Sequence, residues 1–110
     1  MGIERRTHSL MAVIAALLKS PDDDHYGLEL ARIAGIRPGS IYPILVRLEG
    51  KGWISGHWED IDESAEGRRK RKYFRLTGVG AKQAAGELAM WRQEFLRPPI
   101  LAPRLGGTTA

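Results

Sequence analysis

Apolar residues recur at intervals of three or four positions in four stretches of the chain, a spacing typical of the buried face of a helix. The stretches cover about residues 9–19, 26–34, 40–51 and 78–96. Gly35 and Gly52 follow the second and third stretches, where glycine commonly ends a helix. Thr7 or Ser9 can cap the first helix, and an aspartate of the run 22–24 can cap the second. The pattern therefore predicts a mainly helical chain.

The apolar positions also indicate which face of each helix is buried. Pro43 lies inside the third stretch, and it is tolerated if Ser40 is the N-cap, because the N–H groups of the first turn have no intrahelical partner. On the first three helices we expect the following side chains to turn inward: Leu10, Val13, Ile14, Leu17, Leu18, Leu28, Leu30, Ala31, Ile33, Ile41, Ile44, Leu45 and Leu48.

Between the third and fourth helices, residues 52–77 have the pattern of a β-hairpin. The first arm, 53–58, is rich in aromatic and β-branched residues, and the second, 72–76, begins with alternating charged and apolar side chains. The loop between the arms begins acidic and ends in five adjacent cations, 68–72. A run of like charges is commonly a solvated loop, but cations at the tip of a hairpin can also bind a polyanion.

The order of helices and hairpin predicts a winged helix-turn-helix fold, mainly α with a small β-hairpin. In this motif the second helix braces a third helix, whose outer face enters the major groove of DNA. Residues 1–76 would form the DNA-binding domain, and 77–96 a C-terminal dimerisation helix. The segment 97–110 has prolines, glycines and threonines without periodicity, so we expect it to be extended or disordered.

Composition narrows the function further. The chain has 110 residues, a net charge of +4 and an isoelectric point near 9.8, which favour acidic partners. It has no cysteine, which excludes disulfides and thiolate metal sites, and His8, His25 and His57 lack the short spacing of a metal motif. The sequence has no recognisable catalytic arrangement, signal peptide or membrane-spanning run. We therefore expect a cytoplasmic protein that is not an enzyme and binds no cofactor.

The outer face of the third helix is a second candidate contact with DNA. On a helical wheel this face presents Gly39, Pro43, Val46 and Gly50, flanked by Tyr42 and Arg47. Small residues let the helix backbone approach the groove closely, while Arg47 can bind a phosphate or a guanine edge and Tyr42 can donate its hydroxyl to a phosphate. The alternative is that Tyr42 and Arg47 only pack and are solvated.

Three segments carry a family resemblance: Tyr26-Gly27-Leu28-Glu29-Leu30, Gly39-Ser40-Ile41-Tyr42-Pro43-Ile44-Leu45-Val46-Arg47-Leu48-Glu49, and Arg69-Lys70-Arg71-Lys72-Tyr73-Phe74-Arg75-Leu76-Thr77. In content, order and spacing they resemble segments of PadR-family transcriptional regulators, over about residues 10–95. Such regulators are winged-helix homodimers, usually repressors that release promoter DNA when a small molecule or stress signal arrives. The chain resembles the short subfamily, in which the last helix dimerises.

The resemblance also implies where DNA is bound. The implied DNA-binding residues are Ser40, Tyr42, Pro43, Arg47, Arg68, Arg69, Lys70, Arg71, Lys72 and Tyr73. The chain departs from the family pattern after Thr77, where a glutamate often follows and this chain has Gly78, which weakens the start of the fourth helix. The alternative function is a winged-helix module whose hairpin binds an acidic protein.

The fourth helix carries an apolar stripe that is longer than a small core can cover: Ala81, Ala84, Ala85, Leu88, Trp91 and Phe95. We therefore expect part of the stripe to pack on a second copy of the chain, giving a homodimer with two recognition helices. The alternative is that the stripe packs only within its own subunit, against the first helix.

Trp91 suggests an effector site. In some short PadR-like regulators, a tryptophan at the matching place meets its symmetry mate, and the two indoles sandwich flat apolar ligands. The resemblance implies a site for a small aromatic effector made of Trp91, Leu88, Phe95, Met11 and Ile14. An indole offers a broad face for stacking and for cation–π contact. The alternative is a filled dimer core in which Trp91 only packs.

Overall fold

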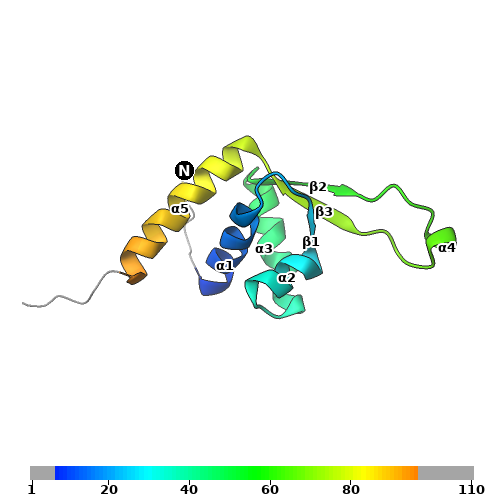
Figure 1. Cartoon of the computed structure of the whole chain (residues 1–110), viewed down its shortest axis with the longest axis horizontal. Helices are drawn as coiled ribbons and strands as arrows, with labels where there is room; N and C mark the ends of the chain where they lie inside the picture. Colours follow the sequence, from blue (N-terminus) through cyan, green and yellow to red (C-terminus); the bar gives the residue numbers. More distant parts are fainter. Residues whose placement is uncertain (1–6, 97–110) are drawn as a thin grey trace, which may run out of the picture.

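The computed structural model describes residues 7–96 and has the winged-helix fold that the sequence predicts (Figure 1). Its elements, in chain order, are α1 (His8–Lys19), β1 (His25–Tyr26), α2 (Gly27–Ala34), α3 (Pro38–Gly50), β2 (Ile54–Trp58), α4 (Glu63–Glu66), β3 (Lys72–Leu76) and α5 (Gly78–Leu96). The first three helices form the body, the β2–β3 hairpin with its loop extends from the body as the wing, and α5 lies along α1 on the side away from the wing (Figure 1). Residues 97–110, expected to be extended or disordered, lie outside the described residues. Within 7–96, no helix is both long and apolar enough to cross a bilayer.

The core forms where the inward faces of α1, α2 and α3 meet. Leu10, Val13 and Leu17 of α1 are almost fully buried, as is Leu48 of α3. Burying a side chain of this size contributes roughly 1.5–3 kcal/mol, so the three helices hold one another in place. The start of α1 is set by Thr7, whose side-chain oxygen accepts a hydrogen bond from the Leu10 N–H at 3.0 Å.

Two expectations for α2 are wrong. Its N-cap is Tyr26 and not an aspartate, because the Glu29 carboxylate reaches back and accepts a hydrogen bond from the Tyr26 N–H at 3.3 Å. Leu28 and Ile33 are 48% and 46% exposed rather than buried, because this short helix turns only one narrow side toward the core. Gly35 ends the helix as predicted, with a φ of 71°.

The third helix begins earlier than the sequence suggested. Pro38 stands in its first turn and Arg37 is the N-cap, so the expectation that Ser40 caps the helix is wrong. Proline suits the first turn, because its fixed φ is helical and its missing N–H has no intrahelical partner there. Pro43 consequently lies inside the helix, where it cannot donate to the carbonyl of Gly39. Both residues are exposed, so solvent can reach the carbonyl that Pro43 leaves without its usual donor.

The wing is built on the antiparallel pair of β2 and β3, and its register places His57 opposite Tyr73. The predicted hairpin is thus confirmed, although β2 begins at Ile54, one residue later than the expected first arm. The sequence did not predict β1, which completes a sheet of order β1–β3–β2, or α4 in the hairpin loop. A strand of 2 residues and a helix of 4 are too short to show a periodic pattern.

The start of α5 is fixed to the residues that precede the wing. Thr77 donates its hydroxyl to the Gly52 carbonyl at 2.7 Å, and the same oxygen accepts a hydrogen bond from the Gly80 N–H at 2.9 Å. Thr77 therefore caps α5, and the helix begins in spite of Gly78. Gly80 is buried against the backbone of Trp53, where an added Cβ atom would overlap the Trp53 carbonyl group.

Gly80→Ala should therefore destabilise the fold by about 1–3 kcal/mol, because the new methyl group forces α5 away from Trp53. Gly86→Ala is the matched control, since Gly86 also lies in α5 and a Cβ atom there meets no neighbour within 4 Å. Alanine is the better helix former, so the control should stabilise the protein by roughly 0.5–1 kcal/mol. Urea unfolding followed by circular dichroism measures the free energy of unfolding of both variants. If both substitutions changed this free energy in the same direction, the close packing of α5 on Trp53 would be contradicted.

Candidate nucleic-acid interface

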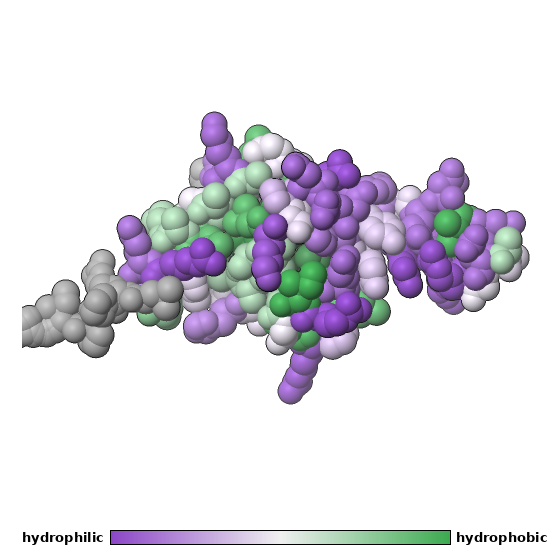
Figure 2. Space-filling model, in the orientation of Figure 1, coloured by the Kyte–Doolittle hydropathy of each residue, from purple (hydrophilic) through white to green (hydrophobic). Residues whose placement is uncertain are grey.

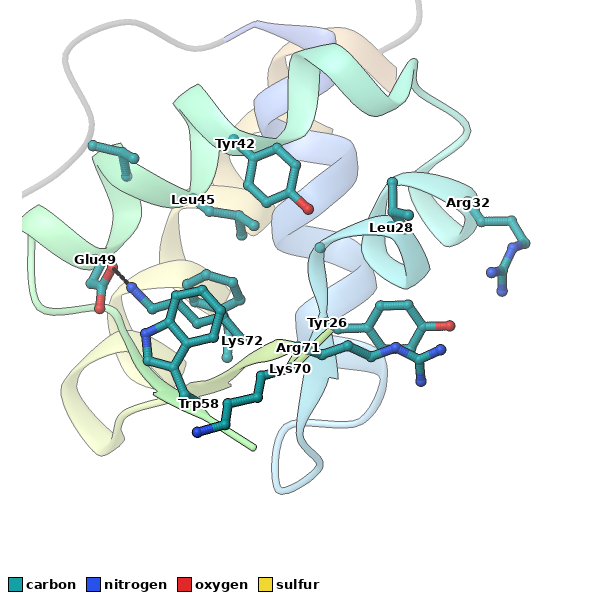
Figure 3. A pocket seen from close by; sticks show the side chains of 13 residues that line it. Tyr26, Leu28, Arg32, Tyr42, Leu45, Glu49, Trp58, Lys70, Arg71 and Lys72 are labelled. Carbon is teal, nitrogen blue, oxygen red and sulfur yellow. Dashed lines mark hydrogen bonds and ion pairs between the residues drawn. The ribbon is translucent and has the colours of Figure 1, made fainter. Parts of the chain in front are cut away.

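A groove of about 550 Å³ separates α3 and the start of α2 from the wing (Figure 3). Its lining includes Leu28, Arg32, Tyr42, Val46, Trp58, Lys70 and Arg71. Figure 2 shows hydrophilic residues over most of the projecting wing, with hydrophobic patches on the body. The groove thus combines exposed apolar walls with positive charge, and this pairing suits a polyanion that also carries apolar groups.

Tyr42 is held in the groove by close packing on α2. Its ring occupies the space beside Gly27, where a Cβ atom would come within 3.0 Å of a ring carbon. Tyr42 nevertheless remains 51% exposed, and Ser40 and Pro43 are exposed on the same helix. Arg47 is half-buried and is held by an interaction of its own. The helix therefore presents Ser40, Tyr42 and Pro43 openly, and Arg47 only in part.

An ion pair fixes the wing against α3. The Lys72 ammonium nitrogen lies 3.3 Å from a carboxylate oxygen of Glu49 (Figure 3). Gly56 on β2 makes room for this contact, since a Cβ atom there would lie 2.6 Å from Lys72 Cε. The next residue, Arg71, places its guanidinium over the Tyr26 ring, 4.6 Å from the ring centre. Lys72 is therefore neutralised within the chain, and Arg71 ties the wing to the start of α2.

The acidic half of the wing loop shapes the basic half. Glu59 binds the Arg68 guanidinium through both carboxylate oxygens, at 2.6 and 3.0 Å, and accepts a hydrogen bond from the Arg71 N–H at 2.9 Å. Chiefly because of the hydrogen bonds from Arg68, the pKa of Glu59 falls from its usual 4.5 to about 2. Glu63 accepts a hydrogen bond from the Lys70 N–H at 2.7 Å. The carboxylates thereby order the backbone that carries the basic run.

The structure divides the five predicted wing cations into groups. Arg68 and Lys72 are paired with carboxylates, and Arg71 rests on an aromatic ring. Arg69 and Lys70 are exposed, and their side chains have no carboxylate partner among residues 7–96. These two side chains are therefore the wing cations most available to an external phosphate.

Sequence reasoning missed several groove residues, among them Leu28, Arg32 and Trp58. Trp58 is 63% exposed at the end of β2, and the aromatic character of that arm was visible in the sequence. The sequence could not show which way the indole faces, because this depends on the strand register. Tyr73, which the sequence assigned to DNA, is half-buried and stacks on His57 with ring centres 6.2 Å apart.

The residues expected to bind an effector lie at the far end of the molecule, where α5 meets the start of α1. Trp91 and Phe95 have ring centres 4.0 Å apart, and the His8 ring meets Trp91 edge-on at 5.0 Å. Phe95 is 56% exposed and Trp91 is half-buried. The remaining expected residues are buried in the core of the chain: Met11, Ile14 and Leu88. Of the expected effector residues, Trp91 and Phe95, which lie beside His8, are therefore the ones that a ligand could reach on a single chain.

Comparison with known proteins agrees with this geometry. The sequence model of the transcriptional regulator PadR-like family matches residues 16–86. A PadR family transcription regulator from Clostridium difficile R20291 is 26% identical, with a TM-score of 0.61 over 78% of this chain and 88% of its own. One from Eggerthella lenta DSM 2243 is 22% identical, with a TM-score of 0.61 over 84% of this chain and 87% of its own. Staphylococcus aureus MepR in complex with DNA shares the fold at 18% identity, with a TM-score of 0.59 over 80% of this chain and 66% of its own. A search of curated proteins found no match.

The carboxyl group of Glu59 should titrate with a midpoint of about 2, and Arg68→Gln should move the midpoint back toward 4.5. Because the folded pKa is lowered, the contribution of this group to stability is complete above about pH 4.5 and is lost as the pH falls through about 2. NMR titration of the side-chain carboxyl carbon measures the midpoint. Arg75→Gln is the control, since Arg75 pairs with Asp24 instead. A midpoint near 4.5 in the unmodified protein would contradict the pairing.

Proposed function

The chain belongs to the PadR-like family of transcriptional regulators, and from this premise we propose that it is a homodimeric repressor that binds promoter DNA and responds to a small aromatic ligand. The observation that carries the DNA-binding part is the groove between α3 and the wing. It brings the wing residues Lys70 and Arg71 beside α3, a helix whose outer face is small and exposed. Arg69, the other open cation, precedes Lys70 on the same wing and is also exposed.

In the proposed complex, α3 enters the major groove and the wing contacts the adjacent backbone. Arg69, Lys70 and Arg71 neutralise phosphates, and this contribution is independent of sequence. Pro43 and Arg47 face the bases, so they influence which sequence is preferred. The carboxylate contacts support this division, because Glu59 orders the wing loop and Glu49 holds the base of the wing against α3.

Residues 77–96 are the proposed dimerisation helix and 1–76 the proposed DNA-binding unit. The end of α5 supports this assignment, because Met90 and Phe95 are 49% and 56% exposed although both are large and apolar. Exposed apolar area of this kind commonly marks a contact with another molecule. A second copy would cover this area and would supply a second recognition helix, so that the dimer reads two half-sites.

The aromatic cluster at the end of α5 supports the proposed ligand response. The rings of Trp91 and Phe95 already pack against one another at a tilt, and pairing two such clusters across a dimer would create a slot between indole faces. A flat aromatic ligand fits such a slot, and a cationic one gains a cation–π interaction. Ligand binding between the subunits would change the distance between the two recognition helices and thereby lower the affinity of the dimer for operator DNA.

Binding to duplex DNA should weaken steeply with salt. If about six to eight phosphates are neutralised per dimer, the slope of log affinity against log salt should be near minus six. The double substitution Arg69→Gln with Lys70→Gln removes up to about four phosphate contacts per dimer, so it should reduce the slope by about three to four on every sequence. Arg47→Ala should instead change the preferred sequence. Fluorescence anisotropy with several duplexes over a salt series measures both effects.

The matched control for the wing double substitution is Arg75→Gln with Lys82→Gln, which removes the same charge outside the groove. This control should change the slope by less than about one. Equal losses in the two variants would mean that net charge, rather than the wing, determines affinity. Comparable salt-sensitive binding to an acidic protein, without binding to duplex DNA, would favour the interaction-module alternative.

The dimer and the ligand site should both depend on the aromatic cluster. Phe95→Asp introduces a charge into the proposed interface, so it should shift the protein from dimer to monomer in sedimentation velocity. Val79→Asp is the control, because Val79 is 63% exposed at the opposite end of α5.

A planar cationic dye should quench the tryptophan fluorescence of the dimer, and Trp91→Ala should abolish the response. Trp58→Ala, which removes an exposed indole from the wing, should retain the response. A monomeric unmodified protein would contradict the dimer, and dye quenching unchanged in Trp91→Ala would contradict the ligand site.

A further inference from the structure

Val46 lies on the outer face of α3 and has no evident role in the fold. It is 69% exposed, the highest value among the exposed large hydrophobic side chains of residues 7–96. The solvent-facing side of a surface helix is normally polar, and a β-branched residue lowers helix propensity. A valine at this position therefore does not stabilise the isolated chain. It does line the groove between α3 and the wing.

The four helical neighbours of Val46 leave this part of α3 poor in free hydrogen-bonding groups. Pro43 and Gly50 have no polar side-chain atoms. Tyr42 rests its ring against Gly27, and its hydroxyl is the group proposed above to bind a phosphate and not a base. Glu49 is engaged by the wing through Lys72. Positions three and four residues apart share one helix face, so the surface around Val46 can contact a base mainly by apolar contact.

Only one apolar group projects into the major groove of DNA, the 5-methyl group of thymine. We propose that Val46 reads this methyl group, so that each half-site of the operator carries an A·T pair facing the middle of α3. The assignment rests on the proposed DNA-binding function. The cations of the same groove support duplex DNA as the occupant, since Arg32, Lys70 and Arg71 line it together with Val46.

The chemistry makes thymine the specific target. Two valine methyl groups can cover the thymine methyl and remove both from water, which contributes about as much as burying one methylene group. Cytosine presents an amino group at the equivalent edge of the groove, and the unpaired donor would face an apolar surface. Pro43, three residues earlier and also exposed, extends the apolar strip toward the next base pair.

Deoxyuridine substitution tests the proposal, because it removes the methyl group and leaves base pairing and the O4 acceptor unchanged. Duplexes bound by the full chain are first selected from random sequence, and each thymine of the selected site is then replaced in turn. For the unmodified protein, one replacement in each half-site should weaken binding by about fourfold, the equivalent of burying one methylene group. For Val46→Ala the same replacement should have less than about half this effect, as a double-mutant cycle measures. Val79→Ala is the matched control, since Val79 is an equally simple exposed valine outside the groove.

The outcomes separate this inference from the function on which it rests. Salt-dependent binding to a selected site with no response to deoxyuridine at any thymine would overturn the reading by Val46 and leave the regulator function standing. A response of equal size in the unmodified protein and in Val46→Ala would also overturn it, because another residue would then contact the methyl group. Failure to select any duplex would overturn both the inference and the proposed function.

Discussion

The geometry of the wing depends on carboxylates that balance part of its positive charge. Five adjacent cations repel one another, and an isolated loop of this composition would spread out in water. Glu59 and Glu49 each take up one of these cations, Arg68 at the tip and Lys72 at the base of the wing. Exposed ion pairs of this kind contribute little to stability. Their main effect is on geometry. Glu59 fixes the shape of the wing loop and Glu49 fixes the position of the wing relative to α3. Arg69 and Lys70 are left facing solvent.

In the proposed complex with DNA, affinity and sequence selectivity would come from different parts of the protein. Phosphates are the same at every step of a duplex, so cations on a projecting wing can hold many sequences equally well. In the proposed complex, selectivity would come from the outer face of α3, which is largely apolar and includes Pro43 and Val46. A surface with few hydrogen-bonding groups distinguishes bases by methyl groups and by the shape of the groove. The proposed regulator would therefore combine electrostatic binding of phosphates with a small number of base contacts.

The two ends of α5 have different constraints. At its start, the Thr77 hydrogen bonds and the buried Gly80 press the helix against the residues that lead into the wing. At its far end, the aromatic rings of Trp91 and Phe95 stand partly in solvent beside α1. In the proposed ligand response, α5 would transmit a displacement of the aromatic cluster to the residues at the base of the wing. The start of α5 packs directly on the Trp53 backbone, so a tilt of the helix would also move the residues that lead into the wing.

The sequence by itself determined the helices α1, α2, α3 and α5, the hairpin and the family, because helical periodicity, the glycine stops and the basic run are local patterns. It misplaced the start of α3, since both Ser40 and Pro38 are plausible first-turn residues and only packing decides between them. It could not predict β1 or α4, which are too short to have a period. Only the tertiary structure decided which cations are paired, that Leu28 faces solvent, and that Trp58 lines the groove with α3. The physical reason is that these properties depend on side chains far apart in the chain, such as Glu49 and Lys72, whose distance is set by the fold.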